Sequence, residues 1–451
     1  MSLVFFTGFI MYLIGLVLSP GLTPFKLLIL FRDGMIIALL ALFFNAVKDR
    51  YLVFYAMLIL LAAAIYYGFD DLQSTFQNGS ADEVPIPLDP TGEILLDPNQ
   101  SQREDLLNYL KEEGLMYGPA FTMDLEGSTE LDEYLIIDLP ENRVDEIDAL
   151  EKELYNRGFV DWFEVNEQIQ VVPLSSASVK RPVPGDYPVN DPLYPKQWHL
   201  QQIGYEGFLK SPPTPLQKGM LAILDTGIDG AHEDLKENLK RSDKQDDQDK
   251  VGHGTHCAGI AGSVTANSKG IASLNIGGRY FDLISVKVLD NRGVGSQHSI
   301  MQGMINAADR GATVLSMSLG GRSNHKRQKA YEAALDYVNK RGAIVIAAAG
   351  NASSDASNYV PASVNGVICI SAIDSNNSIA SFSNHVDKID WSLSAPGTRI
   401  LSTTPNDDYK YFNGTSMATP LVASAVCIMK SLHPDMQTKQ AWSILNEYGK
   451  E

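Results

Sequence analysis

Three long apolar runs occupy the first 69 residues of the chain. They cover residues 2–18, 34–47 and 51–69, and almost no polar position interrupts them. The last run is about as long as a helix must be to cross a bilayer, and a buried soluble helix would show a polar face. We therefore expect residues 1–69 to form a membrane anchor of two or three helices, with the lipid bilayer as the partner of residues 2–69.

The charges beside the third run predict its orientation. Lys48 and Arg50 precede this run, whereas Asp70 and Asp71 follow it. Basic residues are retained on the cytoplasmic side of a membrane helix, so everything after residue 70 is expected outside the cytoplasm. The middle run either spans the bilayer or re-enters it, and both alternatives leave the rest of the chain outside.

The pattern becomes polar after residue 70 and regains order near residue 105. Residues 70–104 are acidic and rich in Pro, Asn and Gly, which is typical of a flexible tether. The ordered elements that follow are a helix over 105–110, a strand over 134–139, a helix over 144–157 and a strand over 168–173. They predict a small α+β domain over 105–175, followed by a proline-containing linker over 176–188.

Residues 189–451 alternate between strand-like apolar runs and helical patterns. The strand-like runs are 220–224, 283–288, 313–318, 343–348 and 366–371. Parallel strands need a crossover connection, usually a helix, so this alternation predicts an α/β domain with a mostly parallel sheet and helices on both faces. Functional side chains are then expected at the carboxyl ends of the strands.

Composition excludes some classes of function. The chain has 54 acidic and 36 basic residues and a formal charge of −18, which argues against nucleic acid as a partner. Its three cysteines are an odd number and show no zinc-binding spacing, so neither a disulfide framework nor a zinc site is expected.

Three local motifs supply a carboxylate, an imidazole and a hydroxyl. Asp225 ends the first strand-like run, His253 opens a helix of small residues in Gly-His-Gly-Thr-His, and Ser416 opens another in Gly-Thr-Ser-Met-Ala-Thr-Pro. A serine hydroxyl is a useful nucleophile only beside a base, and a third group must orient that base. Each motif alone is common, but all three in the chain order Asp, His, Ser indicate a triad for acyl transfer.

These motifs, with Ala-Ala-Ala-Gly-Asn at 347–351, resemble those of the subtilase family of serine proteases over residues 187–451. The resemblance implies a subtilisin-like fold, hydrolysis of peptide bonds in polypeptide substrates, and Asn351 as a donor to the oxyanion. It further implies that residues 105–175 are a propeptide that inhibits the site until the linker is cut. We therefore expect a self-processing zymogen whose peptidase domain covers residues 189–451.

The resemblance also implies where a substrate binds. An extended peptide would lie between Ser318, Leu319 and Gly320 on one side and Gly293 and Gly295 on the other. The pocket for the residue before the cleaved bond, P1, would be lined by Ala348, Ala349 and Gly350. These residues are small and uncharged, which predicts broad specificity with a preference for an apolar P1 residue.

Residues 264–271 resemble a calcium-binding loop found in some subtilases. By resemblance, the ligands would be side-chain oxygens of Asp191, Asp234 and Asn267 and main-chain carbonyls of Val264, Lys269 and Ile271. An all-oxygen set with two carboxylates suits Ca²⁺, so a structural calcium ion is expected. Asp234 is expected on a helix after the strand that ends at Asp225.

Two other functions remain as alternatives. The first is a catalytically silent subtilase fold that serves as a scaffold, against which the complete set of catalytic residues argues. The second is a membrane protein whose main role lies in its N-terminal spans. Arg32 and Asp33 form one charged pair within those spans. A single pair is too little for the relay of charged residues that transport requires.

Overall fold

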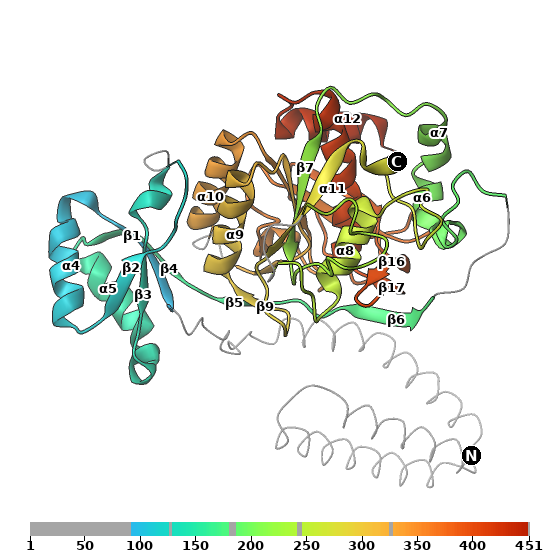
Figure 1. Ribbon diagram of the computed structural model, residues 1–451. Coiled ribbons are helices and arrows are strands. Elements are labelled where there is room, and N and C mark those ends of the chain that lie inside the picture. The colour runs from blue at the N-terminus through green and yellow to red at the C-terminus, as the bar shows by residue number, and fades with distance from the viewer. Residues whose placement is uncertain (1–91, 126–128, 180–185, 241–245, 324–327, 450–451) are drawn as a thin grey trace, which may run out of the picture. The chain divides into compact units, whose positions relative to one another are not determined.

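The structure is a computed structural model that describes residues 92–125, 129–179, 186–240, 246–323 and 328–449. The predicted membrane anchor, residues 1–69, and the tether up to residue 91 lie outside the described residues. Residues 86–451 form one compact unit, which contains a small α+β domain and a large α/β domain (Figure 1).

The small domain has a four-stranded antiparallel sheet with two helices. Its sheet has the order β2-β3-β1-β4. The elements are β1 (Ile94–Pro98), α4 (Arg103–Glu112), β2 (Met116–Pro119), β3 (Leu135–Asp138), α5 (Ile147–Asn156) and β4 (Val160–Val165). Leu106 and Leu110 of α4 and Leu150 and Leu154 of α5 pack into one apolar core with the sheet.

Three expectations for this domain need correction. Strand β1 lies within the predicted tether, yet it is central in the sheet and buried along its whole length. The helix expected over 144–157 starts as a 3-10 helix (Glu141–Glu146) before α5. The last strand of the domain is β4, because β5 (Gln168–Gln170) leaves the sheet and pairs with β9 (Val294–Ser296) of the large domain.

The large domain is built on the predicted parallel sheet, which is confirmed. The sheet has six strands in the order β15-β14-β12-β10-β7-β8, and every neighbouring pair is parallel. The strands are β7 (Gly219–Asp225), β8 (Phe281–Lys287), β10 (Val314–Met317), β12 (Ile344–Ala348), β14 (Ile368–Ile373) and β15 (Ser392–Pro396). The five runs expected from the sequence are all in this sheet.

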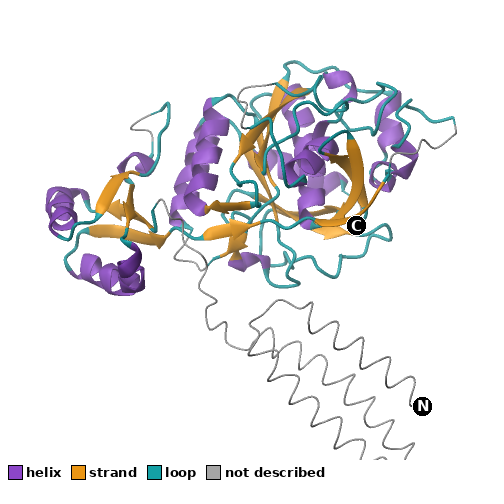
Figure 2. Ribbon diagram, turned by 60° about the horizontal axis from the view of Figure 1, so that its bottom comes forward, coloured by secondary structure: helices purple, strands orange, loops and turns teal. Residues whose placement is uncertain are grey.

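Helices cover both faces of this sheet (Figures 1 and 2). Leu221 and Ile223 of β7 share a core with α8 (His253–Gly262) and α11 (Thr415–Leu432). Ala222 and Leu224 belong to the core on the other face, with α9 (Gln297–Asp309) and α10 (Lys329–Lys340). Successive strand residues point to opposite faces, so a strand covered on both faces is apolar throughout.

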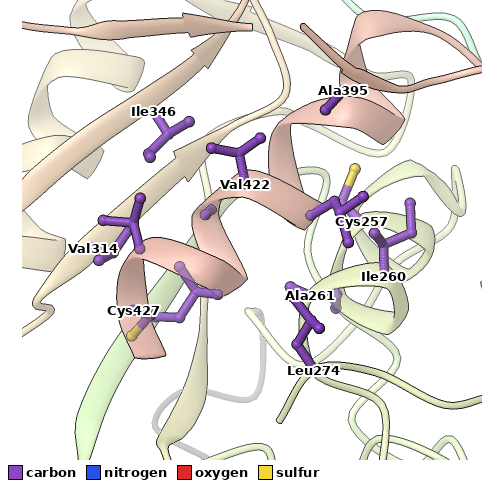
Figure 3. Close-up of a cluster of buried hydrophobic side chains, with 14 of the residues drawn as sticks. Cys257, Ile260, Ala261, Leu274, Val314, Ile346, Ala395, Val422 and Cys427 are labelled. Atoms are coloured by element: carbon purple, nitrogen blue, oxygen red, sulfur yellow. The ribbon is translucent and has the colours of Figure 1, made fainter. Parts of the chain in front are cut away.

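Helix α11 lies at the centre of the core that it shares with α8 and the sheet. Figure 3 shows it between the sheet residues Val314 and Ile346 and the α8 residues Cys257 and Ile260. In the described part of the chain it is the one helix long and apolar enough to cross a membrane, and 83% of it is buried inside the protein. Its apolar character is therefore explained by its place in the core.

The remaining helices and strands lie outside the six-stranded sheet and the four helices named above. The helices are α6 (Trp198–Gln202), α7 (Tyr205–Lys210) and α12 (Thr438–Tyr448). The strands are β6 (Leu174–Ser178), β11 (Gly321–Arg322), β13 (Tyr359–Val360), β16 (Ile400–Thr404) and β17 (Asp408–Asn413). Strands β16, β17 and β6 form an antiparallel sheet, so the predicted linker 176–188 begins as a paired strand.

Candidate active site

The carboxylate of Asp225 is placed by the end of strand β7. The side chain is fully buried, and the main-chain N–H of Thr226 donates to Oδ1 at 2.7 Å. The chain then turns at Gly227, which has φ 98°, and a Cβ there would lie 2.2 Å from the carbonyl oxygen of Gln248. This turn therefore requires glycine and directs the carboxylate toward α8.

His253 is the first residue of α8 and points at Asp225. Its Nδ1 lies 2.9 Å from both carboxylate oxygens of Asp225, and both side chains are buried. At Gly254, a Cβ would lie 2.1 Å from the carbonyl oxygen of Gly227. The glycine after the histidine thus allows α8 to pack closely on the turn that follows Asp225.

The electrostatics of this pair favour a protonated imidazole. Burial lowers the pKa of His253, but the charge of Asp225 and its hydrogen bond outweigh burial and raise that pKa well above its ordinary value. Cys257 Sγ lies 3.9 Å from His253 Nδ1, and burial raises the pKa of this thiol. The charge and hydrogen bond of Cys257 add to the rise in the pKa of His253 that Asp225 produces.

Ser416 lies in the first turn of α11. The helix follows Gly414, which has φ 151°, and the Ser416 side chain is nearly buried. Ser416 Oγ donates to the main-chain carbonyl of Ser318 at 3.1 Å, and Ser318 Oγ donates to the carbonyl of Ser416 at 2.8 Å. The serine hydroxyl must therefore rotate away from Ser318 to reach His253.

Ser416, His253 and Asn351 line one cavity of about 230 Å³. Asn351 follows strand β12, and its Oδ1 accepts hydrogen bonds from the main-chain N–H and the hydroxyl of Thr415, both at 2.9 Å. With its oxygen held in this way, the amide can offer its Nδ2 group to a substrate.

Five of the eight expected substrate residues line this cavity, and Ala349, Gly293 and Gly295 do not. Ser318, Leu319, Gly320, Ala348 and Gly350 line the cavity. Ala349 does not line it, because it is fully buried among Ala356, Ala362 and Cys369. Neighbouring residues of an extended chain point to opposite sides, so Ala348 and Gly350 face the cavity while Ala349 faces the core.

The other expected substrate edge is paired with the chain itself. Gly295 lies in β9, opposite Ile169 of β5, and the carbonyl of Gly293 accepts the N–H of Val171 at 2.8 Å. The edge strand is therefore in contact with the segment that follows the small domain.

Asp249 is a buried residue beside the candidate triad that the sequence reasoning missed. Its buried carboxylate accepts the hydroxyl of Thr226 at 2.9 Å, the main-chain N–H groups of Val251 and Gly252 at 2.9 and 2.8 Å, and the N–H and hydroxyl of Thr255 at 2.9 and 2.7 Å. It thereby ties the loop before His253 to the turn after Asp225. An aspartate that accepts N–H groups two and three residues ahead is a local turn signal, which could have identified it.

The residues expected to bind calcium lie together. Asp191 and Asp234 are buried, Asp191 accepts the N–H groups of Ala266 and Asn267, and Asp234 accepts Asn267 Nδ2 at 2.8 Å and the N–H of Ile271 at 2.9 Å. The main-chain N–H of Val264 donates to the carbonyl of Asp234, and Asn267 Oδ1 accepts the N–H of Lys269. Asp234 lies in a series of turns rather than on the expected helix, since the described residues between 226 and 252, which are 226–240 and 246–252, form no helix.

The donor set of this loop fits a calcium ion. Burial raises the pKa of Asp191 to about 6 and, helped by the charges of Asp191 and Glu233, raises the pKa of Asp234 to about 8. No basic group lowers the pKa of either carboxylate. Two such buried carboxylates are unfavourable as anions, and a bound cation offsets this cost.

Comparisons with known proteins give the class of this chain. The subtilase family matches residues 217–447, more than half of the chain. Thermitase from Thermoactinomyces vulgaris is 40% identical over 216 residues, which are 47% of this chain and 74% of thermitase. A thermophilic serine proteinase from Bacillus sp. (strain AK1) is 34% identical over 255 residues, covering 53% of this chain and 61% of that proteinase. A solved protease structure from Pseudoalteromonas arctica PAMC 21717 has a TM-score of 0.49 and 27% identity, over 59% of this chain and 93% of that one.

The family match and the likeness to thermitase define a subtilisin-like serine protease. The chain belongs to the subtilase family. Members of this family are serine endopeptidases, hydrolases that act on polypeptides.

Proposed function

We propose that the chain is a membrane-anchored serine endopeptidase whose triad is Asp225, His253 and Ser416. The observation that carries this proposal is the 2.9 Å contact of Asp225 with His253 beside the cavity that Ser416 and Asn351 also line. An oriented base, a nucleophile and an oxyanion donor around one cavity are the groups that acyl transfer requires, which supports this proposal.

The geometry assigns a step to each residue. Ser416 Oγ turns from Ser318, gives its proton to His253 and attacks the substrate carbonyl, while Asp225 stabilises the imidazolium. Asn351 Nδ2 and the N–H of Ser416, at the positive end of α11, donate to the oxyanion. The imidazolium then protonates the leaving nitrogen, and water hydrolyses the acyl-enzyme by the same route.

The cavity favours an apolar P1 side chain. Leu319, Gly320, Ala348 and Gly350 contribute to its wall. A pocket of this composition offers no carboxylate to a basic side chain, so an apolar or aromatic residue binds better than lysine or arginine. Cleavage of a peptide panel after lysine or arginine alone would overturn this specificity.

Residues 92–173 act in this proposal as the inhibitory propeptide. Lys329 of α10 lies 2.7 Å from Asp97, and Gln302 of α9 exchanges two hydrogen bonds with the main chain of Thr122, at 3.0 and 2.8 Å. Strand β5 continues from this domain onto the substrate edge β9. The zymogen matures by a cut in the linker 176–188.

The loop with Asp191, Asp234 and Asn267 holds a structural calcium ion in this proposal. The two carboxylates, the Asn267 amide oxygen and the carbonyls of Val264, Lys269 and Ile271 are its donors. The bound ion neutralises the buried carboxylates and fixes the loop that follows α8. It takes no part in the chemistry at Ser416.

The membrane anchor rests on the sequence of residues 2–69, which lie outside the described residues. Basic residues before the third apolar run and acidic residues after it place the peptidase domain outside the cytoplasm. The net charge of −18 agrees with a partner other than nucleic acid.

One experiment tests the catalytic proposal. The full chain and a Ser416→Ala twin are purified in detergent with calcium, and their size and casein hydrolysis are followed with time. We expect the wild type to shorten and to digest casein, whereas the twin does neither. If both remain full length and inert although folded, the chain does not process itself, and the self-processing part of the proposal fails.

A further inference from the structure

The chain passes over its own active site between two paired strands. On one side, β5 pairs with β9, and the N–H of Val171 extends this pairing to the carbonyl of Gly293. A Cβ at Gly293 would lie 2.5 Å from the carbonyl oxygen of Val171, so this close approach requires glycine. The chain is therefore held as an antiparallel partner of β9 as far as Val171.

On the other side the chain is held by β17. Leu174, the first residue of β6, lies opposite Asn413, which is three residues before Ser416. Val172 and Pro173 are the two residues between the paired segments, and both line the cavity together with His253 and Ser416. The peptide bond at the middle of this crossing is the one between Val172 and Pro173.

We infer that the chain presents the Val172–Pro173 bond to Ser416 and that Pro173 protects this bond from hydrolysis. The inference rests on the proposed protease function and names the regulation of the same site. The segment then acts as a substrate-like inhibitor that its own active site does not consume.

The chemistry of acylation explains the protection. Ser416 Oγ must form a bond to the carbonyl carbon of Val172 while the bond from that carbon to the Pro173 nitrogen breaks. The serine proton passes through His253 to that nitrogen, which leaves as a secondary amine. In proline the nitrogen carries the ring carbon Cδ in place of hydrogen, so the imidazolium must approach a crowded atom, and the ring also restricts the backbone of Val172.

The side chain of Val172 is not placed as that of a productive P1 residue. It is 67% exposed, while the cavity of about 230 Å³ beside Ser416 remains open. Ile169, in contrast, is 3% exposed and packs against Gly321, where a Cβ would lie 2.8 Å from it. The segment is thus anchored by main-chain pairing and by Ile169.

Inhibition and maturation then involve two different parts of the chain, the Val172–Pro173 bond and the linker 176–188. A cut at the bond over Ser416 would need no second molecule, because the bond is already in the site. Since Pro173 protects that bond, the maturing cut in the linker is made by another protease molecule.

The test compares full-length wild type, Pro173→Ala and Pro173→Ala/Ser416→Ala in detergent. Intact mass and N-terminal sequencing follow cleavage over time at several protein concentrations. We expect Pro173→Ala to be cut between residues 172 and 173 faster than wild type, at a rate independent of protein concentration. The double variant stays intact, and Pro188→Ala, which changes an exposed proline outside the cavity, behaves as wild type.

The possible results are distinct. Cleavage of the wild type at Val172–Pro173 overturns the inference, because the proline then gives no protection. If Pro173→Ala and Pro173→Ser are folded and digest casein but are not cut at this bond, the segment is not presented as proposed, while the protease function stands. If no form reacts with a fluorophosphonate or digests casein, the protease function fails and the inference fails with it.

Discussion

The carboxylate of Asp249 accepts a hydrogen bond from the hydroxyl of Thr226 at 2.9 Å. Thr226 follows the catalytic Asp225, and Asp249 also holds the main chain just before His253. The hydroxyl of Thr226 in turn accepts the N–H of Gly254 at 2.9 Å. This buried contact therefore ties the turn after Asp225 to the start of the helix that carries His253.

Asp249→Asn is expected to lower kcat with little change in KM. The amide keeps one acceptor oxygen but cannot serve all five donors, so the loop moves and His253 is displaced; about 1 Å of displacement costs on the order of 10²-fold. Steady-state kinetics of the processed enzyme on a peptide substrate measure this. Asp387→Asn, at an exposed site, is the control. Equal kcat in the two variants contradicts a positioning role for Asp249.

The activity of the processed enzyme is expected to fall on the acid side at an unusually high pH. His253 is a base only when neutral, and Asp225 raises its pKa well above 6.5 despite burial, so activity is lost as the pH falls through that raised pKa. Asp225→Asn removes the charge that raises the pKa of His253, while the burial that lowers this pKa remains. The acid side of the activity profile therefore shifts to lower pH, and kcat falls on the order of 10⁴-fold. The measurement is the profile of kcat/KM against pH for both enzymes. If the acid side of the profile lies at the same pH in both, His253 is not the base whose pKa Asp225 raises.

Asn351→Ala is expected to lower kcat through loss of an oxyanion donor. In a subtilisin the loss of one such donor costs roughly 10²–10³-fold in kcat, and we expect the same order here. Because Asn351 also holds Thr415, the matched control is Thr415→Val, which removes one hydrogen bond to the Asn351 oxygen and keeps the Nδ2 donor. If Thr415→Val loses as much activity as Asn351→Ala, the role of Asn351 is to hold the loop and not to bind the oxyanion.

Removal of calcium is expected to lower thermal stability without a change in the catalytic residues. At a free calcium concentration 100 times the Kd, binding stabilises the folded state by about 2.7 kcal/mol, which corresponds to roughly 5–10 °C in Tm. Calorimetry with calcium and with a chelator measures the difference. Asp191→Asn should lose most of the calcium-dependent shift, whereas Asp387→Asn should keep it. A Tm of the wild type that does not respond to calcium excludes the site.

The sequence alone predicted the parallel sheet and the catalytic candidates because each signal is local. A strand buried on both faces is apolar throughout, as β7 is, and the glycines beside His253 and Ser416 mark tight turns before helices. Asp225, His253 and Ser416 each end or begin such an element. Their meeting follows from the rule that the carboxyl ends of parallel strands lie at one edge of the sheet.

The tertiary structure decided what depends on partners far away in the chain. Strand β1 is short and lies in acidic sequence, and only its place between β3 and β4 makes it a strand. Local composition cannot say that β5 leaves its own domain, because its partner β9 is more than a hundred residues away and that partner's edge sets the register. The position of Val172–Pro173 over Ser416 follows from this register, and so it could not be predicted from the sequence alone.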